Sequence, residues 1–301
     1  MLIRHLFYFV TLAKERHYAR AAEACHITQP TLSAAIKKLE DDLGMPLVLR
    51  GHRFAGLTTE GEKLLTWARQ ILSDYQSLRD DLSGSLVGVV GELRLGVIPA
   101  AMPSVSFVTE RFCTANPAST VSVRSMTSRA IAEALDGFEL DGGITYLENE
   151  PIARVHRLPL YTEHYKLAVP RTHPLAKRAS VTWSEAARER LCLLSQDMQN
   201  RRIIDGLVKS LGFSVHPIVT TNSFLAVSAH LRRGGWASIV PHSLFHALGN
   251  QPDLIGLDLV DPIHSESVGV VISDREPRSP MAAALMAAAL AANVESAFTK
   301  L

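Results

Sequence analysis

The chain has 301 residues, of which 47% are hydrophobic and 20% charged, and its formal net charge is +1. This length predicts two domains, and this balance excludes both a disordered chain and a highly basic protein that coats nucleic acid. The three cysteines, Cys25, Cys113 and Cys192, lie far apart and are odd in number, which favours free buried thiols in a reducing compartment over a disulfide framework.

The start of the chain and its apolar runs argue against secretion and membrane insertion. Arg4, His5 and Lys14 interrupt any apolar stretch near the start, so we expect no secretory signal. The longest apolar run, residues 281–292, is too short and too rich in alanine to span a bilayer. We therefore expect a soluble protein of the cytoplasm with no membrane partner.

The first sixty residues favour short helices joined by tight turns. Two short helical segments precede a turn at residues 26–27, and Thr28 can then cap a third helix that has Pro30 in its first turn, where proline is tolerated. Gly44 is placed to end this helix. The helix has apolar side chains at helical spacing along one side, namely Leu32, Ala35, Ile36 and Leu39.

Residues 47–57 follow, with glycines on both sides of basic residues. Gly51 and Gly56 lie around Arg50, His52 and Arg53. This pattern predicts a tight basic hairpin, or wing.

A long helix is expected after Thr59, and its apolar residues step alternately by four and three. This spacing is typical of a coiled coil, and it favours a helix pair between two subunits over one amphipathic helix packed on its own domain. Gly84, Gly88 and Gly91 end the helix and mark a linker. The residues of this seam are Leu64, Ala68, Ile71, Tyr75, Leu78 and Leu82.

After Gly91 strand and helix patterns alternate to the end of the chain. This alternation predicts α/β layers with a largely parallel sheet, and the length favours two lobes joined by crossover strands. The last helix is expected from Pro280, capped by Ser279, to about Phe298. The other expected helices are 99–112, 130–135, 203–211 and 224–232, and the expected strands are 92–97, 121–125, 143–146, 166–169, 191–194, 218–221, 237–240 and 268–272.

Residues 21–33, AAEACHITQPTLS, resemble the signature of LysR-type transcriptional regulators, as do the residues that continue the pattern through 36–40, 43–44, 47, 50, 57–58 and 60–61. Two departures, at residues 17–19 and 48–49, are interpreted as core substitutions. The resemblance implies an α/β multidomain protein: a winged helix-turn-helix domain at 1–58, a linker and dimerisation helix with a hinge at 59–91, and a two-lobed effector-binding domain, similar to periplasmic binding proteins, at 92–301. Lobe one would comprise 92–161 and 267–301, and lobe two 162–266.

The second helix of a helix-turn-helix enters the major groove, where its N-terminal side chains meet base edges. Glutamine suits adenine, hydroxyl groups suit several acceptors, and proline can touch a thymine methyl. Basic side chains nearby can neutralise phosphates without reading sequence. The candidate DNA-binding residues are therefore Thr28, Gln29, Pro30, Thr31, Ser33, Lys37, Arg50 and Arg53; the alternative is an ordinary solvated helix face.

Ligands of open α/β sheets bind beyond the carboxyl ends of strands, often at helix N-termini that favour anions. Hydroxyl and amide groups follow several of the expected strands, and the resemblance implies a cleft between the lobes there. We therefore expect a small carboxylate or another metabolite anion as effector; for Ser128 a role as a helix cap is equally open. The candidate effector-binding residues are Pro99, Ala100, Ser104, Thr127, Ser128, Tyr146, Gln196 and Asn222.

Enzyme motifs are missing from the sequence: there is no GxSxG, HExxH, GxxxxGK or GxGxxG. We expect no catalytic residue, cofactor or metal site. A solute-binding protein or an enzyme with an appended N-terminal domain is the main alternative class, and a general DNA-organising protein is the third. The resemblance implies operator DNA, a small-molecule effector, a second copy of the chain (a dimer or tetramer) and RNA polymerase as partners, and most often an activator.

Overall fold

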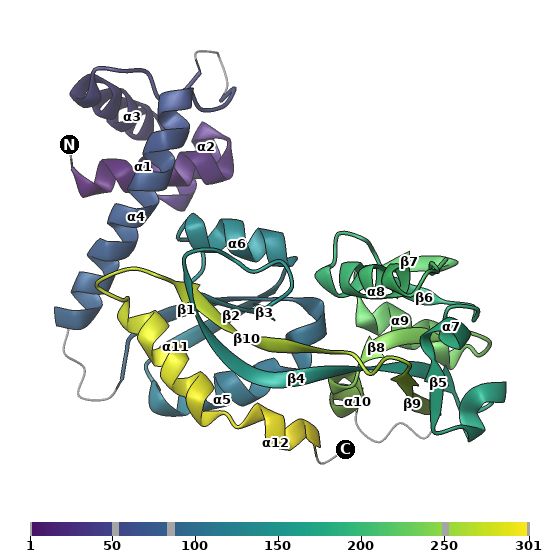
Figure 1. Cartoon of the computed structure of the whole chain (residues 1–301). Helices are drawn as coiled ribbons and strands as arrows, with labels where there is room; N and C mark the ends of the chain where they lie inside the picture. The colour runs from purple at the N-terminus through teal and green to yellow at the C-terminus, as the bar shows by residue number, and fades with distance from the viewer. Residues whose placement is uncertain (1, 50–53, 83–87, 249–252, 300–301) are drawn as a thin grey trace. The chain divides into compact units, whose positions relative to one another are not determined.

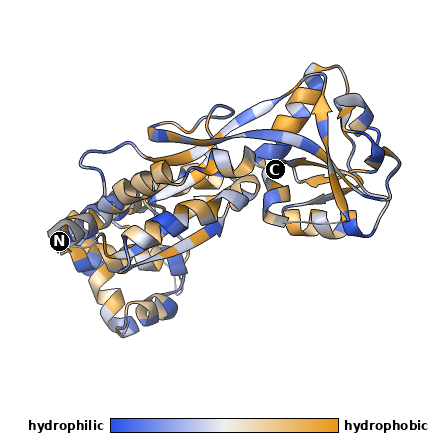
Figure 2. Ribbon diagram, turned by 90° about the horizontal axis from the view of Figure 1, so that it is seen from below, coloured by the Kyte–Doolittle hydropathy of each residue, from blue (hydrophilic) through white to orange (hydrophobic). Residues whose placement is uncertain are grey.

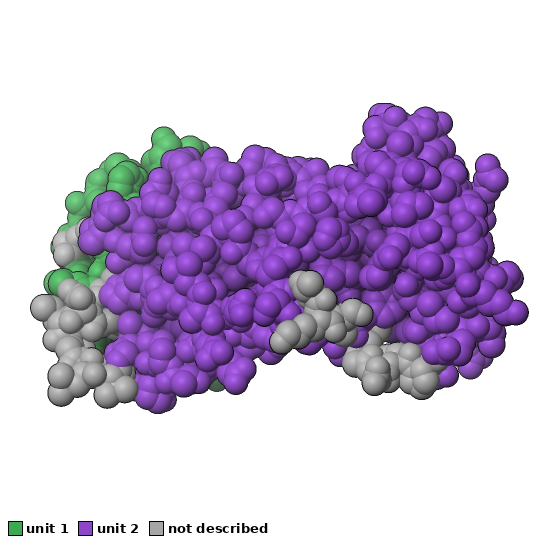
Figure 3. All heavy atoms as spheres, turned by 60° about the horizontal axis from the view of Figure 1, so that its bottom comes forward, with its two compact units in different colours: residues 1–84, 136–139 green, residues 85–135, 140–301 purple. Residues whose placement is uncertain are grey.

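The computed structural model describes residues 2–49, 54–82, 88–248 and 253–299. The chain divides into two compact units (Figure 3). The first comprises Met1–Gly84 with Asp136–Glu139, and the second Ser85–Leu135 with Leu140–Leu301. Among the described residues, no helix is long and apolar enough to cross a membrane.

The first unit is built from helices that share one apolar core. Leu6, Phe9 and Leu12 pack against Leu32 and Leu39, and all five side chains are fully buried. Burial of such side chains contributes about 1.5 to 3 kcal/mol each, which is the main force that holds these short helices together. The helices are α1 (Ile3–Glu15), α2 (Tyr18–Ala24), α3 (Gln29–Leu43) and α4 (Thr59–Leu82) (Figure 1).

Helix α3 begins and ends where the sequence predicts. The Thr28 side chain accepts a hydrogen bond from the backbone N–H of Thr31 at 3.4 Å, and Pro30 lies in the first turn. Gly44 ends the helix with a φ of 70°, a left-handed conformation that glycine adopts without steric cost.

The expected hairpin is present at its base. Val48 and Leu57 form an antiparallel bridge, and the N–H of Leu49 donates to the carbonyl of Gly56 at 3.0 Å. Arg50 and Arg53 lie outside the described residues.

Helix α4 packs closely on this hairpin because Gly61 has no side chain. A Cβ at Gly61 would lie 2.1 Å from the carbonyl oxygen of Leu47. The helix is capped by Thr58, whose hydroxyl oxygen accepts from the N–H of Gly61 at 2.9 Å. The glycine therefore fixes how the long helix joins the rest of the first unit.

The second unit contains a mixed sheet, so the expectation of a largely parallel sheet was wrong. Its strand order is β2-β1-β3-β10-β4-β9-β5, with β8 also paired to β4, and β6 and β7 form a separate parallel pair. Strand β10 runs antiparallel to β3 and β4, and β4 runs antiparallel to β8 and β9. The strands are β1 (Gly91–Val97), β2 (Ser119–Ser125), β3 (Gly142–Tyr146), β4 (Val155–Pro170), β5 (Ser180–Thr182), β6 (Cys192–Leu194), β7 (Val219–Thr221), β8 (Ser238–Pro241), β9 (Leu254–Val260) and β10 (Ser265–Ser273).

Strand β4 joins two lobes of this unit. Residues 155–164 of β4 pair with β10, and residues 165–170 pair with β8 and β9. We call the part around β1, β2 and β3 the first lobe, and the part around β5 to β9 the second lobe. Only residues 166–169 of β4 were expected as strand, because Pro159 and several charged residues interrupt the apolar pattern before residue 166. Figure 2 shows hydrophobic and hydrophilic residues interspersed along the long strands.

Helices cover the sheet in both lobes. The expected final helix is in fact two, α11 (Pro280–Ala291) and α12 (Val294–Thr299), because the backbone turns at Asn293, whose φ is 44°. Ser279 caps α11 as expected, by accepting from the N–H of Ala282 at 3.1 Å. The other helices are η1 (Pro99–Ser104), α5 (Val105–Ala115), α6 (Ser128–Asp136), η2 (Pro174–Lys177), α7 (Trp183–Ala186), α8 (Gln199–Ser210), α9 (Phe224–Arg232) and α10 (Ser243–Leu248).

Candidate functional site

The N-terminal end of α3 presents an exposed polar surface. Leu32, Ala35 and Ile36 are buried on the inner side of the helix, whereas Gln29, Ser33 and Lys37 lie on its exposed side. The free N–H groups of a helix start also favour a phosphate oxygen. Every described residue of the predicted DNA-binding set is exposed: Thr28, Gln29, Pro30, Thr31, Ser33 and Lys37.

The two lysines of α3 differ in their surroundings. Lys38 forms an ion pair with Asp42 at 2.6 Å, one turn further along the helix. This carboxylate already neutralises Lys38, which makes Lys37 the better candidate for a phosphate contact. No acidic residue lies between Thr28 and Lys37.

The predicted seam of α4 divides into two parts. Leu64 and Ile71 are half-buried against the core of the first unit, and Ala68 is fully buried there, so Ala68 offers no surface to a second chain. Tyr75 and Leu78 are 42% and 53% exposed. The alternative of a helix packed on its own domain therefore holds for the first half of the seam; the side chain of Leu82 lies outside the described residues.

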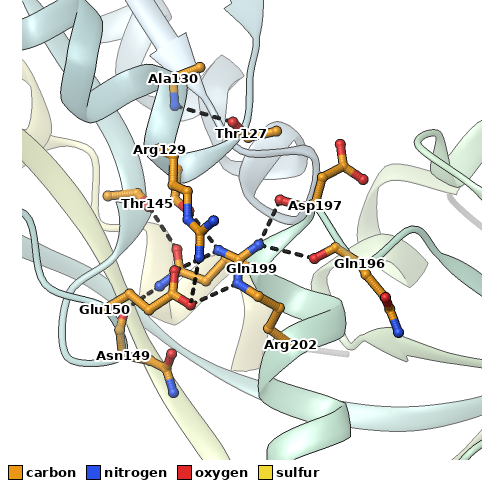
Figure 4. A network of polar contacts seen from close by, with 11 residues as sticks. Thr127, Arg129, Ala130, Thr145, Asn149, Glu150, Gln196, Asp197, Gln199 and Arg202 are labelled. Atoms are coloured by element: carbon orange, nitrogen blue, oxygen red, sulfur yellow. Dashed lines mark hydrogen bonds and ion pairs between the residues drawn. The ribbon is translucent and has the colours of Figure 1, made fainter.

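In the second unit, polar contacts converge on Arg202 of α8 (Figure 4). Its Nε and Nη2 donate to the two carboxylate oxygens of Glu150 at 2.7 and 2.6 Å. Its Nη1 donates to the backbone carbonyls of Gln196 and Asp197 at 3.2 and 2.7 Å. The guanidinium therefore has a fixed orientation, with the two-point geometry that arginine uses to hold carboxylates.

Arg202 also reaches across to the first lobe. Its Nη2 lies 3.4 Å from the hydroxyl oxygen of Ser128, the first residue of α6, which is buried. Thr127 caps the same helix, since its hydroxyl oxygen accepts from the N–H of Ala130 at 3.1 Å. The expected candidates Thr127, Ser128 and Gln196 thus meet at one place, around an arginine that the sequence analysis did not select.

Two buried pairs connect the lobes next to Arg202. The hydroxyl of Thr145 donates to the side-chain oxygen of Gln199 at 3.4 Å, and the Gln199 amide donates to the carbonyl of Asn149. The Asn200 amide donates to the Tyr146 hydroxyl at 3.0 Å. Buried amides with satisfied partners hold one arrangement of the lobes.

Tyr146 belongs to a buried acidic cluster rather than to the surface around Arg202. Its hydroxyl donates to Glu163 Oε1 at 2.5 Å, and the Tyr161 hydroxyl donates to Oε2 at 3.3 Å. Glu163 is fully buried in β4, and Glu266 lies opposite it on β10. Burial raises the pKa of Glu163 to about 8, although the tyrosine hydrogen bonds act in the other direction.

The remaining effector candidates, the described residues Pro99, Ala100, Ser104 and Asn222, make no hydrogen bond to Arg202. Pro99 and Ala100 lie in η1, where the hydroxyl of Ser104 donates to the Ala101 carbonyl at 2.7 Å. Asn222 is exposed after β7. The polar contacts of these described residues therefore do not join the Arg202 network.

A signal for Arg202 was present in the sequence. Arg201 and Arg202 both fall in the first turn and a half of α8, where the positive end of the helix dipole disfavours cations. Arg201 pairs with Asp205 at 2.7 Å, and Arg202 pairs with Glu150. Adjacent arginines at a helix start therefore indicate acidic partners, but the identity of those partners depends on the fold.

The cysteines and the possible metal ligands form no comparable cluster among the described residues. Cys192 is buried in β6, as expected, and burial raises the pKa of its thiol. The expectation of buried thiols was wrong for the other two, since Cys113 is exposed and Cys25 is half-buried. Across the described ranges, no three His, Cys, Asp or Glu side chains are grouped so that they could hold a metal ion.

A helix-turn-helix followed by a paired hairpin and a long helix is the arrangement of a winged DNA-binding domain. Residues 3–62 match the model of the bacterial regulatory helix-turn-helix protein, lysR family, and residues 87–293 match that of the LysR substrate binding domain. The chain therefore belongs to the LysR family of transcription regulators, and its relatives are regulators and not enzymes.

Among its relatives are regulators of the peroxide response. The DNA-binding transcriptional dual regulator OxyR of Escherichia coli K12 is 28% identical over 303 residues, which cover 100% of this chain and 98% of that protein. The hydrogen peroxide-inducible genes activator of Dickeya chrysanthemi is 35% identical over 198 residues, a match that spans only 64% of either protein.

Solved structures of full-length regulators share the fold. A full-length OxyR variant from Pseudomonas aeruginosa has a TM-score of 0.79 and 25% identity, and the match covers 99% of this chain and 96% of that one. CbnR in complex with its target DNA has a TM-score of 0.68 at 24% identity, over 97% and 100% of the two chains.

Proposed function

We propose that this LysR-type regulator reads a specific operator and that a small carboxylate, or another metabolite anion, controls it by binding between the two lobes at Arg202. The observation that carries the proposal is the guanidinium of Arg202. It belongs to the second lobe, it is fixed by two backbone carbonyls, and it faces the buried hydroxyl of Ser128 in the first lobe.

This surrounding suits an anion for three reasons. Arginine binds carboxylates through two parallel N–H···O bonds. Ser128 and the start of α6 add a hydroxyl and the positive end of a helix of nine residues. The Arg202 side chain is 20% exposed, so a small ligand can reach it from solvent.

For the DNA, we propose that the exposed residues of α3 enter the major groove, with Gln29 and Ser33 reading bases and Lys37 contacting phosphate. The target-DNA complex of CbnR, a protein of the same fold, supports this role. Tyr75 and Leu78 would lie in the contact between subunits. A dimer, or a tetramer as two dimers, would match a two-fold operator and contact RNA polymerase in the cytoplasm, most often as an activator.

A second candidate function is a response to peroxide, which the names of several relatives favour. Such sensing needs an accessible thiolate. Cys192 is buried and the pKa of its thiol is raised, which leaves Cys113, on the surface of α5, as the exposed candidate. A peroxide response that is lost in Cys113→Ser would favour this second function.

The main test is a thermal-shift screen of the whole chain with metabolite carboxylates, followed by calorimetry. We expect at least one carboxylate to bind with saturation, and Arg202→Gln to weaken it by about tenfold or more, since a charge-assisted contact is lost. Arg188→Gln, at an exposed arginine of the second lobe, is the matched control. Equal affinities in all three proteins would remove Arg202 from the site.

A further inference from the structure

Glu150 holds the position that an effector carboxylate would take at Arg202. Both of its carboxylate oxygens accept from the guanidinium, at 2.7 and 2.6 Å, and Arg129 lies 3.9 Å from Oε1. A bidentate contact of this kind uses the fork of donors that would otherwise be open to a ligand.

The backbone at Glu150 is unusual for this residue type. Its φ is 51°, in the left-handed region, which is uncommon for residues other than glycine and asparagine. A strained conformation persists where the surroundings hold it. Here the strained residue pairs closely with Arg202, at 2.6 Å, and more distantly with Arg129, at 3.9 Å.

The two partners of this ion pair are held unequally. Arg202 keeps two further hydrogen bonds to backbone carbonyls of its own lobe, so its guanidinium stays in place when Glu150 leaves. Glu150 lies on the segment after β3, in the first lobe, and its side chain is 37% exposed against 20% for Arg202. The carboxylate is thus the partner that can be replaced.

From this geometry we propose that Glu150 is an internal counter-ion that occupies the effector site, so that the effector must present a two-oxygen anionic group and displace it. The proposal rests on the function proposed above and adds the regulation of that site. Glu150 is part of the first lobe, so its ion pair with Arg202 ties the two lobes together. A ligand that replaces Glu150 is not attached to the first lobe, and it can therefore favour another arrangement of the lobes.

The competition has a defined direction. The hydrogen bond from Arg202 holds the pKa of Glu150 below its usual value, so the competitor is charged at neutral pH. The apparent affinity of a ligand equals its intrinsic affinity multiplied by the fraction of molecules in which Glu150 has left Arg202. Removal of the Glu150 charge should therefore tighten carboxylate binding. If the Glu150 side chain belonged instead to a cation site, removal of its charge should weaken binding.

The test compares Glu150→Gln with the wild type and with Glu148→Gln. Glu148 lies two residues earlier in the same segment and is exposed, so its variant has the same change of net charge. The probes are acetate, succinate and benzoate, with sulfate as a second kind of anion, titrated in thermal-shift and calorimetric experiments. We expect the half-saturating carboxylate concentration to fall by about tenfold in Glu150→Gln and to stay unchanged in Glu148→Gln.

Glu150→Asp keeps the charge but has a shorter side chain, so its half-saturating carboxylate concentration should lie between those of the wild type and Glu150→Gln. This variant also provides the test if Glu150→Gln folds poorly. Equal or weaker binding in Glu150→Gln, with binding still lost in Arg202→Gln, would overturn the counter-ion while leaving the proposed function intact. Failure of every probe to bind any of the proteins with saturation would overturn both.

Discussion

Replacement of Glu163 by Gln should stabilise the second unit at neutral pH. The carboxyl group is fully buried, it accepts from Tyr146 and Tyr161, and Glu266 lies opposite it on β10. Its pKa is about 8 in the folded chain against an ordinary value of 4.5. Between these values the native state binds a proton that the unfolded chain does not, so folding must include proton uptake.

The magnitude follows from the pKa difference. Each pH unit above 4.5 lowers the free energy of unfolding by about 1.4 kcal/mol, so at pH 7.5 the wild type is less stable by up to about 4 kcal/mol than a chain with a neutral group at this position. The folded pKa is the higher one, so wild-type stability falls as the pH rises from 4.5 and levels off above 8. Glutamine is neutral at every pH, and its carbonyl can accept from a tyrosine as the protonated acid does.

Hydrogen exchange of the β4 amides gives the assay, because it reports the opening of the strand that carries Glu163. The β4 amides of Glu163→Gln should exchange more slowly than those of the wild type at pH 7.5. The difference in the free energy of opening between the two proteins should shrink by about 1.4 kcal/mol for each pH unit toward pH 5. Glu133→Gln, on the exposed face of α6, should show no such trend. A difference between Glu163→Gln and wild type that is independent of pH would refute the protonated carboxyl.

Three further predictions concern the first unit. Gln29→Ala or Ser33→Ala should weaken operator binding by roughly 1 to 3 kcal/mol and relax base preference at unchanged melting temperature; intact discrimination against random DNA in competition gel shifts would count against base reading. Asp at both Tyr75 and Leu78 should give monomers, because these exposed side chains would face a second chain; a dimer in sedimentation would exclude this contact. Gly61→Ala should lower the free energy of unfolding by about 1 to 3 kcal/mol, because its Cβ meets the Leu47 carbonyl; an unchanged denaturation midpoint would contradict the close packing.

Local signals in the sequence were enough to predict the two ends and the buried side of α3. Thr28, Pro30 and Gly44 specify the ends of that helix through capping and backbone preference, and the apolar spacing of Leu32 and Ile36 decides which side is buried. These effects act within a few residues, so they can be read without the fold.

Non-local arrangements could not be read in the same way. β4 was recognised only over its last residues, because pairing with β10 rather than its own composition makes the rest a strand. The partners of Arg202 lie 52 and 74 residues away, at Glu150 and Ser128. The heptad spacing of α4 was correctly seen, but spacing alone does not tell whether Ala68 packs in its own unit or on another chain.

Control of operator binding by a carboxylate at Arg202 is tested most directly by an operator footprint in the presence of a carboxylate. The whole chain is used to select its site from random DNA, and the site is then footprinted with the carboxylate that gives the largest thermal shift. We expect enrichment of a two-fold sequence and a footprint that the carboxylate changes in the wild type and in Arg188→Gln but not in Arg202→Gln. No enrichment, or the same change in all three proteins, would contradict this control.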